Sequence, residues 1–542
     1  MANQCDLITR FLILGSICSS ESFRFSRLAV DQKLGKGPSA SHDEACVARG
    51  VNGTGQWLDF SNVQLVITGT IPSSDFLKLM NAAEDPVGIT GDQSFIESVY
   101  LNKVPWYETM AWKHAFYDSF KSGISNANAH DFITSTNAEN LTRFMDLAPQ
   151  EPDMFAGVEE WESNRTVRIR HVRNALRTSA LFLDKKESLK RAVRGVKDWI
   201  TMSKNVKNWL RQQMEKKVDW DSVFKRPDGS FKVLLFMENM IGFGNTILLQ
   251  RIESELSTLE FRSKQGKVFR PSVLCVVTTM DPEVGSEGTP EKIKERHPEW
   301  IVPIGNRAAQ LEELVQKADS FQPDIAIATP ASSYHWDVRP DLYTRLQEKP
   351  RRPVLWLGEY DYGETAEDSG FSQPMWALGL GEDSAGIVVP SALPHKLELP
   401  WVSQIAETLA SLKSSTSHML LFAYLHTEDA VRDYLLLAKR FSKVAGKKVI
   451  VVMPRMKCIP KDEESHQHDF RNMEAMLQRL IRPSGPFGGT LKVIRAEEGD
   501  SVMQWNADNS ACMRVSKAAV AAPQVAISSS SELRAALGLD LT

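Results

Sequence analysis

The sequence predicts an α/β protein with two Rossmann-like domains, a basic helical insertion and an additional N-terminal α/β segment. Three observations predict this class. Apolar runs typical of buried strands alternate with helical patterns through two long regions, 231–400 and 418–520. A shorter region, 61–120, has the same alternation. The stretch 165–217 lies before the first long region and is helical and rich in Lys and Arg.

The length and composition indicate a multidomain globular protein. The chain has 542 residues, of which 42% are hydrophobic and 24% charged, so wholesale disorder and a collagen-like repeat are excluded. We expect an irregular extension, a partial Rossmann-like segment, a basic helical connector, a Rossmann-like domain, a second Rossmann-like domain and a tail. Their ranges are 1–60, 61–150, 151–228, 229–400, 401–520 and 521–542.

The first α/β segment alternates strands and helices around a short Gly-bearing turn. We expect strands at 63–68, 87–90 and 103–107, with helices at 75–83 and 95–101.

The turn reads Gly88-Ile-Thr-Gly-Asp-Gln-Ser94. Small residues let the backbone approach a ligand, and the amides at a helix N-terminus favour an oxyanion such as a pyrophosphate. We expect Asp92 or Ser94 to cap the helix and Asp92 to bind a ribose or sugar hydroxyl, because a carboxylate repels phosphate. The predicted ligand residues are Gly91, Asp92, Gln93 and Ser94. Tyr107, Glu108, Lys113 and His114 follow this turn.

The connector is strongly basic, although the net charge of the whole chain is slightly negative. Residues 165–217 hold sixteen Lys or Arg and four Asp or Glu, a local charge of +12 within a chain of −4. Helices are expected at 167–182 and 189–213. This charge suits an anionic partner such as a nucleic acid or a membrane surface. It also suits a solvated connector, or helices that lie against the acidic remainder of the chain.

The first Rossmann-like domain contains three candidate loops. Strands are expected at 233–236, 273–278, 325–328 and 353–357, with helices at 246–259 and 308–318. The turn Glu238-Asn-Met-Ile-Gly-Phe-Gly-Asn245 follows the first strand, with Gly242 and Gly244 as a lone G-x-G. Glu359, Tyr360 and Asp361 follow the last strand, where neighbouring carboxylates suit acid/base work. The Gly-rich loop 379–387 is a candidate hinge or second ligand loop.

The second Rossmann-like domain is expected to follow a helix at 401–411. It would contain strands at 418–425, 448–453 and 491–494 and helices at 429–444 and 470–481. The chain after 521 looks weakly structured.

No metal and no resident cofactor are expected. Asp219-Trp-Asp221 has D-x-D spacing, but it follows a basic helix rather than a buried strand. The six cysteines are scattered, which favours free thiols and a cytoplasmic location. Secretion through the signal-like run at 11–18 is the alternative. No apolar run approaches the ~20 residues of a transmembrane helix.

Together these motifs resemble GT-B-fold, nucleotide-sugar-dependent glycosyltransferases, most nearly the bacterial protein-arginine rhamnosyltransferases. That family has N-F-G-D, L-E-Y, L-F-x-Y-E and R-G-E-D-S motifs. The similar segments here are Gly242–Asn245, Glu359 with Tyr360, Leu421–Tyr424 and Gly91–Ser94. The resemblance implies two facing Rossmann-like domains and a nucleotide-sugar donor.

Two departures from the family pattern bear on activity. The catalytic aspartate of N-F-G-D is Asn245 here, and an amide is no general base, so Glu238 or Asp361 would have to replace it. The G-D-Q-S motif also precedes both domains instead of ending the second one. Either the chain is circularly permuted, with 61–130 completing the sheet of 418–500, or it is a tandem with truncated copies.

The resulting expectation is a metal-independent glycosyltransferase with a nucleotide-sugar donor and a protein or glycan acceptor. The catalytic candidates are Asp361, Glu359 and Glu238. The donor-binding candidates are Gly91, Asp92, Gln93, Ser94, Gly242, Gly244, Asn245 and Tyr360. The alternatives are an inactive, transferase-derived binding protein and a module that binds an anionic surface or nucleic acid through 165–217.

Overall fold

The protein is described by a computed structural model. It covers Ile71, Leu539 and the ranges 60–68, 73–110, 113–150, 165–239, 244–279, 290–304, 307–329, 353–358, 375–381, 384–389, 400–425, 427–454, 490–496, 501–505, 512–516, 524–527 and 530–537.

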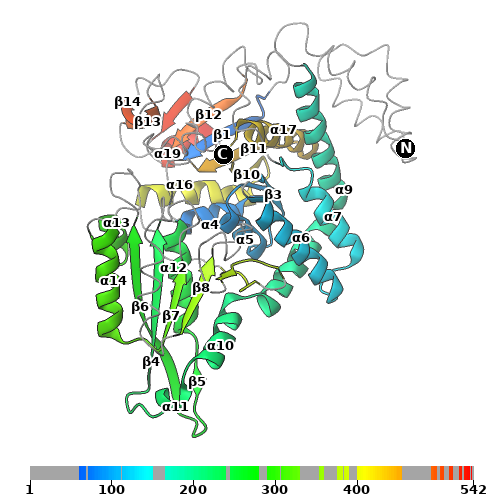
Figure 1. The fold of residues 1–542 in the computed structure, drawn as a ribbon. Helices are drawn as coiled ribbons and strands as arrows, with labels where there is room; N and C mark the ends of the chain where they lie inside the picture. Colours follow the sequence, from blue (N-terminus) through cyan, green and yellow to red (C-terminus); the bar gives the residue numbers. More distant parts are fainter. Residues whose placement is uncertain are drawn as a thin grey trace, which may run out of the picture.

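The first sheet has seven strands and draws them from both ends of the chain (Figure 1). Its spatial order is β15-β12-β1-β11-β10-β2-β3, and every pair is parallel. The strands are β15 (Gln524–Ile527), β12 (Lys492–Ala496), β1 (Val63–Thr68), β11 (Lys448–Pro454), β10 (His418–Tyr424), β2 (Val87–Ile89) and β3 (Pro105–Tyr107).

Strand β1 lies inside this sheet rather than at an edge. Leu65 pairs in register with Val451 on one side and with Val493 on the other. All six residues of β1 are buried, as expected for a parallel strand whose two faces are both covered. The segment 61–107 is therefore a structural part of the sheet formed by 418–527.

The strand order shows where this sheet changes winding direction. If β10, β11, β1, β2 and β3 are numbered 1 to 5, their spatial order in the sheet is 3-2-1-4-5, which is the order of a doubly wound fold. The chain leaves β10 toward β11 on one side and leaves β2 toward β3 on the other side. The topological switch point, where such sheets bind ligands, thus lies between β10 and β2.

The second sheet is formed by a single region, 230–377. Its order is β5-β6-β4-β7-β8-β9, in which only the β5–β6 pair is antiparallel. The strands are β4 (Ser230–Asn239), β5 (Phe261–Arg262), β6 (Val268–Thr279), β7 (Ile325–Thr329), β8 (Val354–Gly358) and β9 (Met375–Ala377). Without β5, the order is 2-1-3-4-5, with a switch point between β4 and β7.

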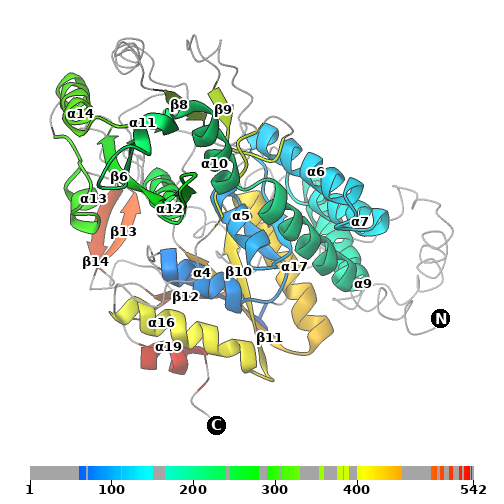
Figure 2. The ribbon, with the colours of Figure 1, turned by 90° about the horizontal axis from the view of Figure 1, so that it is seen from below.

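Helices cover the sheets and connect them. They are α4 (Ser73–Ala82), α5 (Asp92–Tyr100), α6 (His114–Ala129), α7 (Ser135–Met145), α9 (Arg165–Ser203), α10 (Val206–Lys217), α11 (Trp220–Val223), α12 (Gly244–Ser257), α13 (Pro290–Arg296), α14 (Arg307–Phe321), α16 (Pro400–Ser411), α17 (Glu428–Ala445) and α19 (Ser530–Leu537). Helix α9 is 39 residues long and packs on α5, α6, α7 and α17. Figure 2 shows α10 continuing from α9 toward α12.

Helices α5 and α12 connect the two sheets. The strands of the second sheet point toward the first sheet (Figure 1). Arg251 of α12 forms an ion pair with Glu97 of α5, and both side chains are buried. Arg251 is the eighth residue of α12 and Glu97 the sixth of α5, so the ion pair joins the middle parts of two helices that each start at the switch point of their own sheet.

Several expectations were wrong in detail. The segment 61–150 and the region 401–520 were expected as separate units, but their strands share one sheet, as the first of the two alternatives requires. The tail was expected to be weakly structured, yet β15 extends the sheet and α19 packs on α16. The expected helix at 470–481 and the extension 1–59 lie outside the described residues.

Candidate functional site

The G-D-Q-S turn lies at the switch point of the first sheet. Strand β2 ends at Ile89 and helix α5 begins at Asp92, earlier than expected. The N-cap is Gly91, in an extended conformation, and no side chain caps the helix, so the prediction that Asp92 or Ser94 caps it was wrong. The first helical hydrogen bond runs from Phe95 N to Gly91 O. The amides before it project from the positive end of the helix, which favours an anion.

Asp92 belongs to a buried polar cluster. Its side chain is 3% exposed and accepts a hydrogen bond from the Tyr107 hydroxyl at 2.5 Å. The Lys113 ammonium lies 3.4 Å from the same carboxylate oxygen and donates to Thr90 O at 2.9 Å. Asp92 therefore holds Lys113 beside the start of α5, where the ammonium offsets the negative charge of the Asp92 carboxylate.

Glu108 connects the ends of three strands. It follows β3 and is completely buried. One carboxylate oxygen accepts from the Thr90 hydroxyl, and the other accepts from Thr427 N at 2.8 Å and from Thr427 Oγ1 at 2.5 Å. Thr427 is the N-cap of α17. The chain thus places its own carboxylate at the N-terminus of α17, just as it places Asp92 in the first turn of α5.

Sequence reasoning found part of this cluster. It predicted Asp92, Gln93 and Ser94 as ligand residues, and all three lie in the first turn of α5. It missed Thr90 and Thr427. A hydroxyl residue directly after a strand and before a helix was the available signal for both.

The G-F-G-N turn occupies the switch point of the second sheet. Strand β4 ends at Asn239 and α12 begins at Gly244, so Gly244 and Asn245 are helical; Gly242 lies outside the described residues. Glu238 is 6% exposed and pairs in register with Thr278 of β6. Glu238 therefore lies one residue before the carboxyl end of the central strand, where doubly wound sheets place functional groups.

Glu359, Tyr360 and Asp361 lie outside the described residues. Strand β8 ends just before them, at Gly358, and is parallel to β7. In the sequence they therefore come directly after a strand that ends at the same edge of the sheet as β4, the strand of Glu238.

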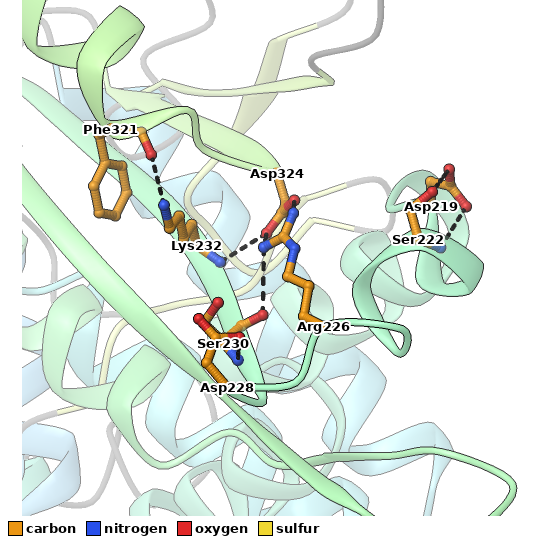
Figure 3. A network of polar contacts seen from close by, with 8 residues as sticks. All are labelled: Asp219, Ser222, Arg226, Asp228, Ser230, Lys232, Phe321 and Asp324. Carbon is orange, nitrogen blue, oxygen red and sulfur yellow. Dashed lines mark hydrogen bonds and ion pairs between the residues drawn. The ribbon is translucent and has the colours of Figure 1, made fainter.

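The D-x-D segment lies at the opposite, amino end of the second sheet (Figure 3). Asp219 is the N-cap of α11 and accepts from Ser222 N at 3.3 Å and Ser222 Oγ at 2.6 Å. These hydrogen bonds lower the pKa of Asp219. Nearby, Asp324 accepts from Arg226 and from Lys232 N, which ties the turn before β4 to β7. Asp219 thus has a structural role in capping.

The basic connector lies against acidic residues of the first sheet and of α12. Lys190 lies 3.2 Å from Asp85, and Lys186 lies 3.8 Å from Glu84. Lys207 of α10 lies 3.9 Å from Glu255 of α12. Part of the excess positive charge is therefore neutralised within the chain, although Arg177, Arg191 and Arg194 are exposed.

Within the described residues, no group of three His, Cys, Asp or Glu side chains is placed to hold a metal ion. None of the described helices has both the length and the apolar character needed to span a bilayer.

No protein-family model, curated protein or solved structure matches this chain.

Proposed function

We propose that the protein is a metal-independent glycosyltransferase of the GT-B type, which transfers a sugar from a nucleotide-sugar donor. One observation carries the proposal. Insertion of β1–β3 into the sheet of β10 and β11 brings the G-D-Q-S turn to the switch point of a doubly wound sheet. Helix α12, which follows the central strand of a second doubly wound sheet, is joined to α5 through Glu97 and Arg251.

The first sheet supplies the donor site. The amides at the start of α5 and the Ser94 hydroxyl would bind the donor diphosphate, and Lys113 would add a positive charge. As the bond to the sugar breaks, negative charge develops on the leaving nucleoside diphosphate, and positioned donors stabilise it without a metal ion. Asp92 is enclosed by Tyr107 and Lys113, so it acts by positioning Lys113 rather than by binding a ribose hydroxyl as the sequence predicts.

The second sheet supplies the general base. Glu238 is the candidate whose position is described, and Asp361 and Glu359 are the alternatives after β8. A carboxylate at this edge would remove a proton from the acceptor hydroxyl or amide while the sugar is transferred. The acceptor is a protein or a glycan.

The test separates binding from transfer. A panel of UDP-, GDP- and dTDP-sugars is screened by thermal shift and by release of the nucleoside diphosphate. We expect at least one donor to raise Tm, Lys113→Met and Ser94→Ala to weaken that shift, and the matched Lys264→Met to leave it unchanged. Lys264 is exposed and lies between β5 and β6 of the second sheet.

Glu238→Gln should retain the shift and lose turnover. Absence of a shift with every donor in the panel rules the proposal out. If the intact protein binds a donor but releases no nucleoside diphosphate, it is instead the inactive, transferase-derived binding protein.

A further inference from the structure

A small polar cavity lies at the bend between α9 and α10, far along the chain from the G-D-Q-S turn. Its volume is about 270 Å³. The lining residues are Ser203, Lys204, Asn205, Asn208, Trp209, Gln212, Trp376, Ser384, Ala385 and Gly386. They come from the end of α9, the first turns of α10, strand β9 and the Gly-rich loop after β9. The cavity is slightly smaller than the ~300–1,000 Å³ of sites that bind drug-sized ligands.

The bend is held by backbone pairing with the Gly-rich loop. Ile387 N donates to Lys204 O at 2.9 Å, and Val206 N donates to Ile387 O at 3.0 Å. Gly386 has a φ of +89°, and a Cβ there would lie 2.6 Å from Lys204 O. Only glycine permits both this conformation and this approach. The loop of 379–387 is thus docked on the connector.

Hydrogen bonds within the two walls fix their shape. Asn205 caps α10 by accepting from Lys207 N at 2.8 Å. Ser384 Oγ donates to Gly379 O at 2.7 Å, and Gly379 N donates to Gly386 O at 2.9 Å. A cavity whose walls are already ordered loses little entropy when a ligand binds.

The chemistry of the lining is specific. Two indole rings, of Trp209 and Trp376, meet edge to face with centroids 5.3 Å apart. Three amide side chains and two hydroxyls surround them, and these groups both donate and accept hydrogen bonds. Among the described residues that line the cavity there is no carboxylate and one cation, Lys204, and the Lys217 ammonium lies over the Trp376 ring, 5.6 Å from its centroid. A neutral ligand with many hydroxyls is well matched to these amide and hydroxyl groups.

We propose that this cavity binds a neutral sugar ring, as a free monosaccharide or as the end of an oligosaccharide. The apolar C–H face of the ring packs on indole, and its hydroxyls exchange hydrogen bonds with the amides of Asn208 and Gln212. The size of the cavity suits one ring. The site is separate from the donor site at α5, and it does not require that the protein transfer sugar.

The cavity is nevertheless tied to the first sheet. Leu380 N, in the same loop, donates to Ser119 Oγ of α6 at 2.9 Å. Helix α6 begins one residue after Lys113. A bound sugar would therefore rest on a loop that packs against the helix following the donor site.

Direct binding tests the inference. Glucose, galactose, mannose, N-acetylglucosamine and rhamnose are titrated by calorimetry into the full chain, with glucuronate as the charged comparison. We expect at least one neutral sugar to bind with a Kd of about 1 mM, a typical value for weak binding. Gln212→Leu and Trp376→Phe should each weaken this binding at least about tenfold, a change equivalent to one decade in Kd.

Gln213→Leu is the matched control, because Gln213 is the next residue on α10 but does not line the cavity. It should leave the affinity unchanged. Two outcomes overturn the inference: no neutral sugar binds up to about 50 mM, well above that expected Kd, or the affinity is the same in the Gln212, Trp376 and Gln213 variants. Loss of donor binding in the Lys113 variant would leave sugar binding here intact, so the two proposals fail separately.

Discussion

Glu108 accepts hydrogen bonds from both the backbone amide and the hydroxyl of Thr427, although 319 residues separate them. Glu108 follows β3 and Thr427 is the N-cap of α17, so this contact joins the early segment of the chain to the late one. The Thr90 hydroxyl adds a third hydrogen bond from the end of β2. The candidate donor site is therefore assembled from two distant parts of the sequence.

Removal of the Glu108 carboxylate should destabilise the early segment 87–107 and the late segment 427–445 together. In Glu108→Ala, the buried groups of Thr90 and Thr427 lose their acceptor, and each orphaned buried group costs about 1–3 kcal/mol. We expect the free energy of unfolding to fall by about 3 kcal/mol. Hydrogen exchange should accelerate in both 87–107 and 427–445. Glu139→Ala, at an exposed position of α7, is the control. Faster exchange in only one of the two segments would contradict the contact.

A chain that starts at residue 151 should not form the first sheet. It lacks β1, which pairs with β11 and β12, and β2, which pairs with β10. Buried parallel strands without neighbours expose unpaired backbone groups and apolar surface. We expect β10 and β11 to lose hydrogen-exchange protection while β4 and β6 retain theirs. Addition of the fragment 1–150 in trans should restore protection. Unchanged protection of β10 in the shortened chain would disprove the dependence.

The sequence predicted the individual elements far better than their assembly. The strands at 63–68, 418–425 and 448–453 are all present, because their continuous apolar runs identify buried parallel strands. The pairing of β1 with β11 was only one of two alternatives, since periodicity shows which face is buried and not which strand covers it. The same limit applies to the site. Asp92 could be predicted from its turn, but its contact with Lys113 depends on tertiary packing.

Helix α5 shows why local capping rules were insufficient. Asp92 and Ser94 both favour N-cap positions, but Gly91 occupies the cap and Asp92 pairs with Tyr107 and Lys113. The tertiary contacts outweigh a cap worth about 1 kcal/mol.

Stability should decrease below about pH 6.5 in a way that depends on His418. Burial lowers the pKa of His418 from its usual 6.5, and the nearby Lys448 lowers it further. Below pH 6.5 the unfolded chain therefore binds a proton that the folded chain still excludes, and the proton stabilises the unfolded state. His418→Gln should weaken this pH dependence. Denaturation at pH 8 and pH 5.5 measures it, and an identical pH dependence in both proteins would contradict the assignment to His418.

The ion pair between Glu97 and Arg251 should respond differently to single and double substitution. Arg251→Met leaves a buried carboxylate beside Tyr424, whose pKa is raised by burial and by Glu97. Loss of one partner of a buried pair costs about 3–5 kcal/mol, whereas apolar replacement of both is often nearly neutral. We expect Glu97→Leu with Arg251→Met to recover most of the lost Tm. A double variant as unstable as the sum of the two single variants would contradict this account.

The connector should contribute to stability rather than bind nucleic acid. Lys190 pairs with Asp85, which is buried and also accepts from Val104 N at 2.8 Å, so Lys190→Glu places two carboxylates together. We expect a loss of about 1 kcal/mol, because Lys190 is partly exposed and solvent screens the pair. Charge reversal at Arg173, Arg177, Arg191 and Arg194 should leave the binding of a single-stranded RNA unchanged at low salt. A loss of RNA affinity that steepens as salt is lowered would instead show phosphate contacts by these arginines and establish the connector as an anion-binding surface.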